Sequence, residues 1–462
     1  MLEAQQSDET ADIASDEDRA HAELVANVSE ALGALDDARV RQYVADLRAP
    51  DLADLIEHLN PNERVSFVQA LGPDIDYEIF SELDEAVRDQ LSEELPNEFL
   101  AKAVTELDSD DAAYVLENLE PEDRRDVLDQ LTLTDRAALL RNLEYPEESA
   151  GRLMQSDFVA VAPFWNVGQV IDYMRETEDL PHVFSEIYVV DPTFRVLGAV
   201  ELSRLLRSKR AVNISDIMSE HGQTVLATED QEEVARQFER YDLYSAPVVD
   251  ENQRLVGVIT VDDIVEVITK EADEDIRLLG GVGDESVFDN VFETTKSRFL
   301  WLLVNLGTAI LASFVIKMFD ASIEQLVALA VLMPIVASMG GNAGTQTMTV
   351  AVRALATREL SSVNAMRIVL RETSVGLING MLFAVILGGI TFLWFGSGPL
   401  GFVIAAAMVF NHLAAALAGI LIPLALDRFG QDPAIASSVF VTTVTDVIGF
   451  FAFLGLATIW LL

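Results

Sequence analysis

Residues 434–461, AIASSVFVTTVTDVIGFFAFLGLATIWL, form a long apolar run that carries a single acid, Asp446. Four further apolar runs precede it, at about 299–319, 323–349, 374–395 and 400–426. A hydrocarbon core of about 30 Å needs roughly 20 helical residues, so each run predicts a membrane-spanning helix. Five spans place the two chain termini on opposite sides of the membrane.

The charge of the chain is divided between its two halves. The 462 residues include 76 acids, 31 bases and no Cys, with a net charge of −45. Residues 293–462 hold eight acids and eight bases, so the whole excess belongs to residues 1–292. This acidity argues against nucleic-acid binding, and the lack of Cys excludes disulfides and thiolate metal sites. Solubility or a saline habitat would also explain acidity spread over a surface.

The bases that flank the spans predict the orientation. Seven of them fall on the side of the acidic part, and Lys317 alone falls on the other. The positive-inside rule therefore places residues 1–295 in the cytoplasm and the C-terminus outside. We expect the membrane to be the plasma (inner) membrane of a prokaryote. The polar first 45 residues predict no cleavable signal peptide.

Polar residues inside the spans are candidates for function. An isolated carboxylate is costly in lipid, which predicts that Asp446 faces a bundle interior or a wet cavity, with structural hydrogen bonding as the alternative. The second span ends in SMGGNAGTQ at 338–346. Its glycines predict an unwound or sharply thinned helix that lines a cavity, whereas close helix packing is the alternative. Asn411 and His412 lie in the fourth span, and His412 is expected to be a packing residue.

Two internal repeats organise the acidic half. Leucines recur every 12 residues from Leu59 to Leu143, with a second apolar residue three or four places earlier in most units. This spacing predicts a solenoid of short helices over 46–150 that binds another domain, after an acidic, partly disordered tail at 1–45. Farther on, VVDPTFRVLGAV at 189–200 aligns with VVDENQRLVGVI at 248–259. Each copy predicts a β-hairpin with an Asp-x-x-x-Arg turn, in α/β units at 151–211 and 212–270.

The second repeat resembles a tandem pair of cystathionine-β-synthase-type (CBS) domains, including GVITVDD at 257–263. In that family Thr/Ser-x-x-Asp positions hold the ribose of an adenine nucleotide, which implies an ATP-type site at Thr260 and Asp263. The first copy reads Glu201-Leu202-Ser203-Arg204 at these positions and departs from the pattern. A purely structural role for the pair is the alternative.

An acidic helix is predicted at about 263–279. Glu271, Glu274 and Asp275 share one face because they lie at i, i+3 and i+4. Their repulsion favours a divalent cation, with a solvated face as the alternative. The connecting (plug) segment, 271–296, then leads into the membrane part, 297–462.

Over essentially its whole length the chain resembles the MgtE-type magnesium channel family. The resemblance depends on the order of the parts and on the strings GGNAGTQ at 340–346, RALA at 353–356, DPA at 432–434 and DVIG at 446–449. It implies a multidomain membrane protein with a cytosolic α-solenoid, an α/β CBS pair, a connecting helix and a five-helix all-α transmembrane domain. It also implies a homodimer, with a pore on its two-fold axis, that takes up Mg²⁺ and maintains magnesium homeostasis.

Site residues follow from this resemblance. The pore would bind hydrated Mg²⁺, which dehydrates reluctantly, through Asp446, Gly449, Ser338, Gly341, Thr345 and Thr445. Ser438 and Thr345 stand where family members frequently have Asn, and Co²⁺, Mn²⁺ and Ni²⁺ are further candidate ions. Cytosolic Mg²⁺ would close the channel at Asp230, Glu232, Asp242, Asp263, Glu266, Glu271, Glu274, Asp275 and the solenoid acids Asp108, Asp110 and Asp111.

Other classes of function fit the sequence less well or equally well. A nucleotide-sensing membrane regulator would have no reason to keep Asp446 at depth. A proton- or sodium-coupled divalent-cation carrier is not separated from a channel by sequence. The chain has no Ser-His-Asp order, HExxH string or phosphate-binding Gly loop, so we predict that it is not an enzyme.

Overall fold

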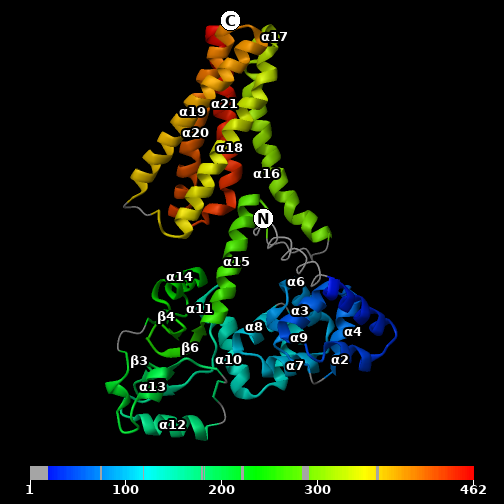
Figure 1. Ribbon diagram of the computed structural model, residues 1–462, viewed down its shortest axis with the longest axis vertical. Coiled ribbons are helices and arrows are strands. Elements are labelled where there is room, and N and C mark those ends of the chain that lie inside the picture. The colour runs from blue at the N-terminus through cyan, green and yellow to red at the C-terminus, as the bar shows by residue number, and fades with distance from the viewer. Residues whose placement is uncertain are drawn as a thin grey trace, which may run out of the picture. The chain divides into compact units, whose positions relative to one another are not determined.

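The computed structural model describes residues 19–72, 75–117, 119–177, 180–181, 183–219, 223–283, 291–360 and 364–462 (Figure 1). The chain divides into two compact units, Met1–Glu271 and Ala272–Leu462. Residues 1–18 of the predicted acidic tail and 284–290 of the predicted connecting segment lie outside the described residues. The described part of the tail begins with a helix at 19–33.

Short helices form the first part of the N-terminal unit, as the leucine repeat predicts. They are α2 (Asp37–Val44), α3 (Ala49–His58), α4 (Pro61–Leu71), α5 (Ile79–Glu82), α6 (Glu85–Glu94), α7 (Asn97–Glu106), α8 (Ser109–Glu117), α9 (Pro121–Gln130) and α10 (Leu133–Glu144). Most pack against the next helix but one, as in the series α2, α4, α6, α8 and α10. The predicted helical solenoid is therefore confirmed.

The repeating leucines end these helices. Five of them are extended residues directly after the last helical turn: Leu59, Leu83, Leu95, Leu107 and Leu131. All of these except Leu131 are buried. Each leucine thus turns the chain and anchors the turn in the core, while Pro61 and Pro121 begin the following helices, where the missing N–H costs nothing.

Two matching three-stranded sheets follow. In the first, β2 (Glu186–Val190) pairs in parallel with β1 (Ala160–Val161) and antiparallel with β3 (Val196–Glu201). In the second, β5 (Ser245–Val249) pairs in the same way with β4 (Val225–Leu226) and β6 (Leu255–Thr260). The hairpin strands recur at the repeat offset read from the sequence. The helices of this part are α11 (Ala150–Leu153), α12 (Val167–Glu176), α13 (Leu202–Arg207), α14 (Gln231–Tyr241) and α15 (Val261–Gly280).

The predicted Asp-x-x-x-Arg turns are confirmed in both hairpins. The Asp191 carboxylate accepts hydrogen bonds from the backbone N–H groups of Thr193 at 2.7 Å and Arg195 at 3.0 Å. Asp250 accepts the equivalent bond from the Arg254 N–H at 2.9 Å. These bonds hold Phe194 in the left-handed region, at φ 66°, where its side chain alone would not favour it. The aspartate therefore specifies the turn.

The C-terminal unit contains six helices after the end of α15, counted over its described residues. They are α16 (Val291–Lys317), α17 (Asp320–Gln325), α18 (Ala328–Ala356), α19 (Ala365–Phe395), α20 (Gly398–Arg428) and α21 (Pro433–Trp460). All but α17 contain an apolar stretch long enough to cross a membrane, which confirms the five predicted spans. The central helix is α20, because it packs against α18, α19 and α21 (Figure 1).

The prediction that residues 338–346 unwind is wrong. Helix α18 runs without a break from Ala328 to Ala356. A Cβ on Gly344 would lie 2.5 Å from the Val441 side chain, and one on Gly419 would lie 2.7 Å from the Gly344 carbonyl oxygen. These glycines therefore allow neighbouring helices to approach closely, and the helix keeps its backbone hydrogen bonds.

Candidate functional site

Asp446 lies within the spanning stretch Ser438–Trp460 of α21, with its side chain half-buried. Contacts between α18 and α21 show which residues of α18 lie beside Asp446 along the helix axis. Gly344 lies against Val441 and Thr445, whereas Gly340 and Gly449 lie against the same side chain of α20. The two helices thus run antiparallel, and Asp446 is level with residues 340–345 of α18.

The predicted pore residues fall into two groups. Ser338 and Thr345 are exposed in the single chain, and a Cβ on Gly341 would meet no atom within 4 Å. Thr445, by contrast, is 0% exposed, and its hydroxyl donates to the Thr442 carbonyl oxygen at 2.9 Å. Gly449 is also buried. The open face of α18 therefore carries Ser338, Gly341 and Thr345, while Thr445 and Gly449 pack between helices.

Two buried polar side chains of the membrane helices, Asn411 and Glu372, were assigned no role from the sequence. Asn411 is 0% exposed, and its Nδ2 donates to the Val336 carbonyl oxygen at 2.7 Å. Glu372 is buried near the start of α19, just before the predicted span. An amide or an acid next to an apolar run is the signal that could have found them. His412 is a packing residue, as predicted, because it is buried, bonds the Met408 carbonyl through Nδ1 and stacks on Phe383.

Carboxylates from two parts of the N-terminal unit converge on one cavity, which we call the acid cavity. Asp110 and Asp111 come from the first turn of α8, and Asp263 and Glu266 come from α15. The cavity has a volume of about 210 Å³, and Arg88 and Lys270 also line it. Helix α8 belongs to the solenoid and α15 follows the second sheet. The solenoid and the α/β tandem therefore meet at acids that the resemblance had singled out.

The carboxylates of the acid cavity are partly removed from water and repel one another. Burial raises the pKa of Asp111 to about 7, and the charges of Asp263 and Glu266 add to that shift. Burial likewise raises the pKa of Asp263 to about 7 and that of Asp110 well above its usual range. Asp110 is 3% exposed, and its Oδ1 has no hydrogen-bond partner among the described residues. A bound cation would relieve both the repulsion and the unpaired oxygen.

A second acidic group surrounds Glu271. Gln231 Nε2 donates to Glu271 Oε1 at 2.6 Å. Burial raises the pKa of Glu271, and the nearby charges of Glu232, Glu148 and Asp230 raise it further. Asp242 is not part of this group, because it is an exposed left-handed residue at the far end of α14. Glu148 was missed, since no local pattern marks it.

The second half of α15 belongs to the C-terminal unit. Its Leu278 and Leu279 pack against buried side chains of α18 and α21, including Met348 and Val441. Burial raises the pKa of Asp275, and the charge of Asp432 raises it further. Asp432 caps α21 by accepting from the Ala434 N–H at 2.7 Å. Glu274 is half-buried one residue earlier. The connecting helix therefore brings an acid next to the first turn of the helix that carries Asp446.

None of these acidic groups is a closed metal shell. Over the described ranges, no three His, Asp or Glu side chains are placed to hold one bare metal ion. The acid cavity instead leaves room for water between its carboxylates. Because Mg²⁺ usually keeps several of its waters in proteins, this spacing fits a hydrated ion better than a stripped one.

The predicted nucleotide residues lie in a nearly closed cleft. Thr260 Oγ1 donates to Asp263 Oδ2 at 2.7 Å, and Asp263 lines the acid cavity. The cavity beside Thr260 has a volume of about 20 Å³, enough for a water molecule and far too small for a nucleoside. The ribose site at Thr260 and Asp263 stays a prediction, and it would require this cleft to widen.

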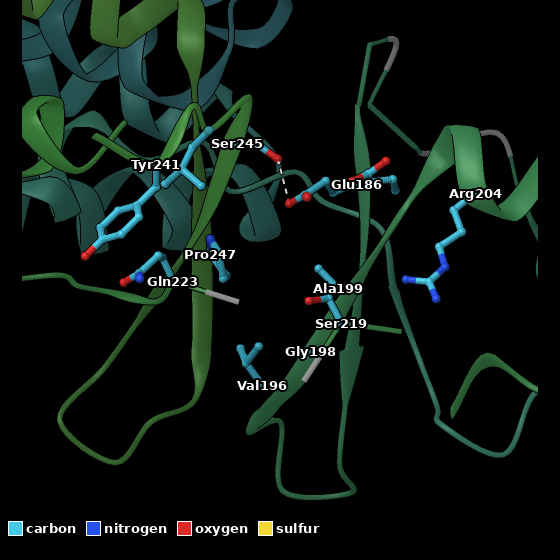
Figure 2. A pocket seen from close by; sticks show the side chains of 12 residues that line it. Glu186, Val196, Gly198, Ala199, Arg204, Ser219, Gln223, Tyr241, Ser245 and Pro247 are labelled. Carbon is cyan, nitrogen blue, oxygen red and sulfur yellow. Dashed lines mark hydrogen bonds between the residues drawn. The ribbon is translucent and has the colours of Figure 1, made fainter. Parts of the chain in front are cut away.

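The equivalent cleft of the first copy is open (Figure 2). It has a volume of about 270 Å³ and is lined by residues that include Glu186, Glu201, Arg204 and Tyr241. Glu186 and Glu201 lie opposite each other on β2 and β3, and Ser245 Oγ donates to Glu186 at 3.3 Å. Glu186 and Ser245 line both cavities, whereas Glu201 and Arg204 line only the open one and Thr260 only the small one.

Comparisons with known proteins cover both units. Family models match at 47–148 (MgtE intracellular N domain), 150–210 and 214–270 (CBS domain) and 333–456 (divalent cation transporter, MgtE). The magnesium transporter MgtE of Thermus thermophilus is 36% identical over 323 residues, which are 69% of this chain and 71% of that protein. The magnesium transporter MgtE of Bacillus subtilis is 32% identical over 317 residues, covering 68% and 70% of the two chains. A solved cytosolic domain of the Mg²⁺ channel MgtE, in complex with ATP, is 31% identical, covers 53% of this chain and 99% of its own, and has a TM-score of 0.49.

Proposed function

Because the chain belongs to the MgtE family of magnesium transporters, we propose that it is a homodimeric channel for Mg²⁺ uptake that cytosolic Mg²⁺ closes. The observation that carries this proposal is Asp446, a half-exposed carboxylate in the middle of a span. A charged residue at the centre of a membrane helix costs about 2.5–3.5 kcal/mol on insertion scales. Water and a passing cation on a two-fold axis would offset that cost.

The open face of α18 fits a hydrated ion. Ser338 and Thr345 offer hydroxyl groups, and Gly341 offers space for the ion's water shell. Two copies of Asp446 facing one axis would add a charge of −2, which favours a divalent over a monovalent cation. Contact through water keeps the binding weak enough for the ion to leave. Thr445 and Gly449, which pack between the helices, would then hold Asp446 and the open face of α18 in position.

The acid cavity supports the proposed gating. Without a cation, Asp110, Asp111, Asp263 and Glu266 repel one another across the contact between the solenoid and the α/β tandem. Hydrated Mg²⁺ in this cavity, and near Glu271 and Asp275, would stabilise the compact arrangement. An ion that binds one arrangement more tightly shifts the population toward it, and we assign that arrangement to the closed channel.

No nucleotide step is part of this proposal. The ATP-type site predicted from the CBS resemblance would require the cavity of about 20 Å³ beside Thr260 to widen, and Asp263 faces carboxylates that would repel a phosphate. What the proposal needs from the tandem is a stable frame that presents Asp263 and Glu266 to the solenoid.

Flux into liposomes tests the transport proposal. Purified full-length protein is reconstituted, and Mg²⁺ entry is followed with a fluorescent indicator. We expect wild-type protein and Asp320→Ala, which removes an exposed acid outside the spans, to conduct, and Asp446→Ala to lose flux. Transport at the wild-type rate by Asp446→Ala would overturn the proposal. Flux that persists when sodium and proton gradients are collapsed supports a channel, whereas flux that requires either gradient supports a coupled carrier.

A further inference from the structure

Asn411 occupies an unusual place among the membrane helices. Its side chain is fully buried in α20 and donates through Nδ2 to the Val336 carbonyl oxygen of α18 at 2.7 Å. Its Oδ1 is buried and finds no hydrogen-bond partner among the described residues. A buried amide with an unpaired acceptor is costly, so packing alone does not explain it.

Two glycines make room for this amide from opposite helices. A Cβ on Gly449 of α21 would lie 2.8 Å from Asn411 Nδ2 and 3.1 Å from Oδ1. A Cβ on Gly340 of α18 would overlap the amide group outright. Neither glycine has a positive φ, so neither is needed for the local backbone conformation. Both are therefore matched to the side chain of Asn411.

The same two glycines flank the proposed ion path. Gly340 is the direct neighbour of Gly341, and Gly449 lies three residues, about one helical turn, after Asp446. The amide of Asn411 therefore separates the segment of α18 that carries Gly341 from the segment of α21 that carries Asp446. A change in its size or its hydrogen bond would alter the distance between these segments.

We propose that Asn411 is a positioning residue of the ion pathway, which sets the separation of α18 and α21 at the level of Asp446. This inference rests on the proposed function, because it assumes that the ion passes Asp446. Asn411 itself touches no ion. It acts as a spacer between Gly340 and Gly449, and its hydrogen bond to Val336 fixes its orientation. Leucine has the same branching without the hydrogen bond, so Asn411→Leu separates the two contributions.

The test is a rescue experiment on full-length protein in liposomes. Gly449→Ala puts a methyl group into the amide, and we expect its Mg²⁺ flux to fall at least tenfold. Adding Asn411→Ala removes the clash, so the double variant should recover to within threefold of Asn411→Ala alone. Gly389→Ala, where a Cβ would meet nothing within 4 Å, is the matched control and should conduct like wild type.

A readout beyond folding separates positioning from mere core packing. Asn411→Ala and Asn411→Leu should shift the half-saturating Mg²⁺ concentration severalfold and reduce the preference for Mg²⁺ over Ca²⁺. Equal loss of flux by Gly449→Ala with and without Asn411→Ala would overturn the inference, as would unchanged half-saturation in both Asn411 variants. Wild-type flux in Asp446→Ala would instead overturn the proposed pathway, whatever the Asn411 variants do.

Discussion

The acid cavity and Asp446 are both candidate ion sites, and they differ in how their charges are surrounded. In the cavity, four carboxylates lie close together, and partial burial with mutual repulsion raises their pKa values. Asp446 is the lone acid of its span and is half-exposed in the single chain. A cluster of acids is strongly stabilised by one bound ion, and that binding shifts the protein toward the compact arrangement. A lone acid binds weakly and lets the ion pass.

The largest effect is expected when the charge of Asp446 is removed. We expect Asp446→Asn to lower Mg²⁺ flux by at least about 100-fold, because a neutral amide cannot stabilise a divalent ion at membrane depth. Asp110→Asn, an equally small change in the acid cavity, should leave the maximum flux of Mg²⁺-free vesicles unchanged. Equal losses of flux in the two variants would contradict the assignment of Asp446 to the ion pathway and of the acid cavity to gating. The measurement is initial flux into liposomes at matched protein density.

The next effect concerns the acids of α15. Neutralising Glu271, Glu274 and Asp275 together should give a channel that stays open when Mg²⁺ on the side of the N-terminal unit is high, with roughly tenfold more current than wild type, since the ion no longer favours the closed arrangement. Patch recordings with Mg²⁺ varied on that side provide the measurement. Asp273→Asn, an exposed acid of the same helix, is the control. Undiminished inhibition in the triple variant would contradict the assignment.

Local patterns account for what the sequence predicted well. Apolar length specified the five spans, the leucine period specified the solenoid turns, and the Asp191 and Asp250 turns specified the hairpins. Each of these depends on residues close together in the chain. Asp446 was found in the same way, because one carboxylate in an apolar run is visible without any partner.

Tertiary contacts account for what was missed or misread. The glycines of α18 suit either unwinding or close packing, and Asn411 on another helix decides between them. Glu148 and Asp432 gain their importance only next to Glu271 and Asp275. The meeting of Asp110 and Asp111 with Asp263 came from family resemblance, since no spacing in the sequence joins α8 to α15. Burial at such junctions is a property of the fold, not of a motif.

A smaller effect measures how Mg²⁺ stabilises the acid cavity. In calorimetry of the full-length protein, Mg²⁺ at about 100 times its dissociation constant adds about 2.7 kcal/mol, which raises the unfolding temperature of the N-terminal unit by roughly 5–10 °C. The double variant Asp110→Asn with Asp263→Asn should unfold at a higher temperature than wild type without Mg²⁺. It should also lose most of the rise in unfolding temperature that Mg²⁺ produces. Asp126→Asn, an exposed acid of α9, should keep the wild-type increment. A full increment in the double variant would show that Mg²⁺ binds elsewhere.

The smallest expected effect is a dependence of this stability on pH. Burial raises the pKa values of Asp111 and Asp263 to about 7, well above their unfolded values near 4. A carboxyl whose pKa is raised on folding stabilises the protein below its unfolded pKa, and that contribution is lost as the pH rises through the folded pKa. Without Mg²⁺, the N-terminal unit should therefore lose about 2 kcal/mol between pH 6 and pH 8, or roughly 4 °C or more in unfolding temperature.

The comparison that isolates these two groups is the difference between wild type and Asp111→Asn with Asp263→Asn across the same pH range. The other ionisable groups are common to both proteins, so their contributions cancel in the difference. Saturating Mg²⁺ should flatten the pH dependence of wild-type stability. Bound Mg²⁺ stabilises the charged carboxylates, so protonating them no longer stabilises the fold. Identical slopes in the two proteins would mean that the acid cavity is already neutralised by its own bases, Arg88 and Lys270, and it would then have no need of a metal ion to close.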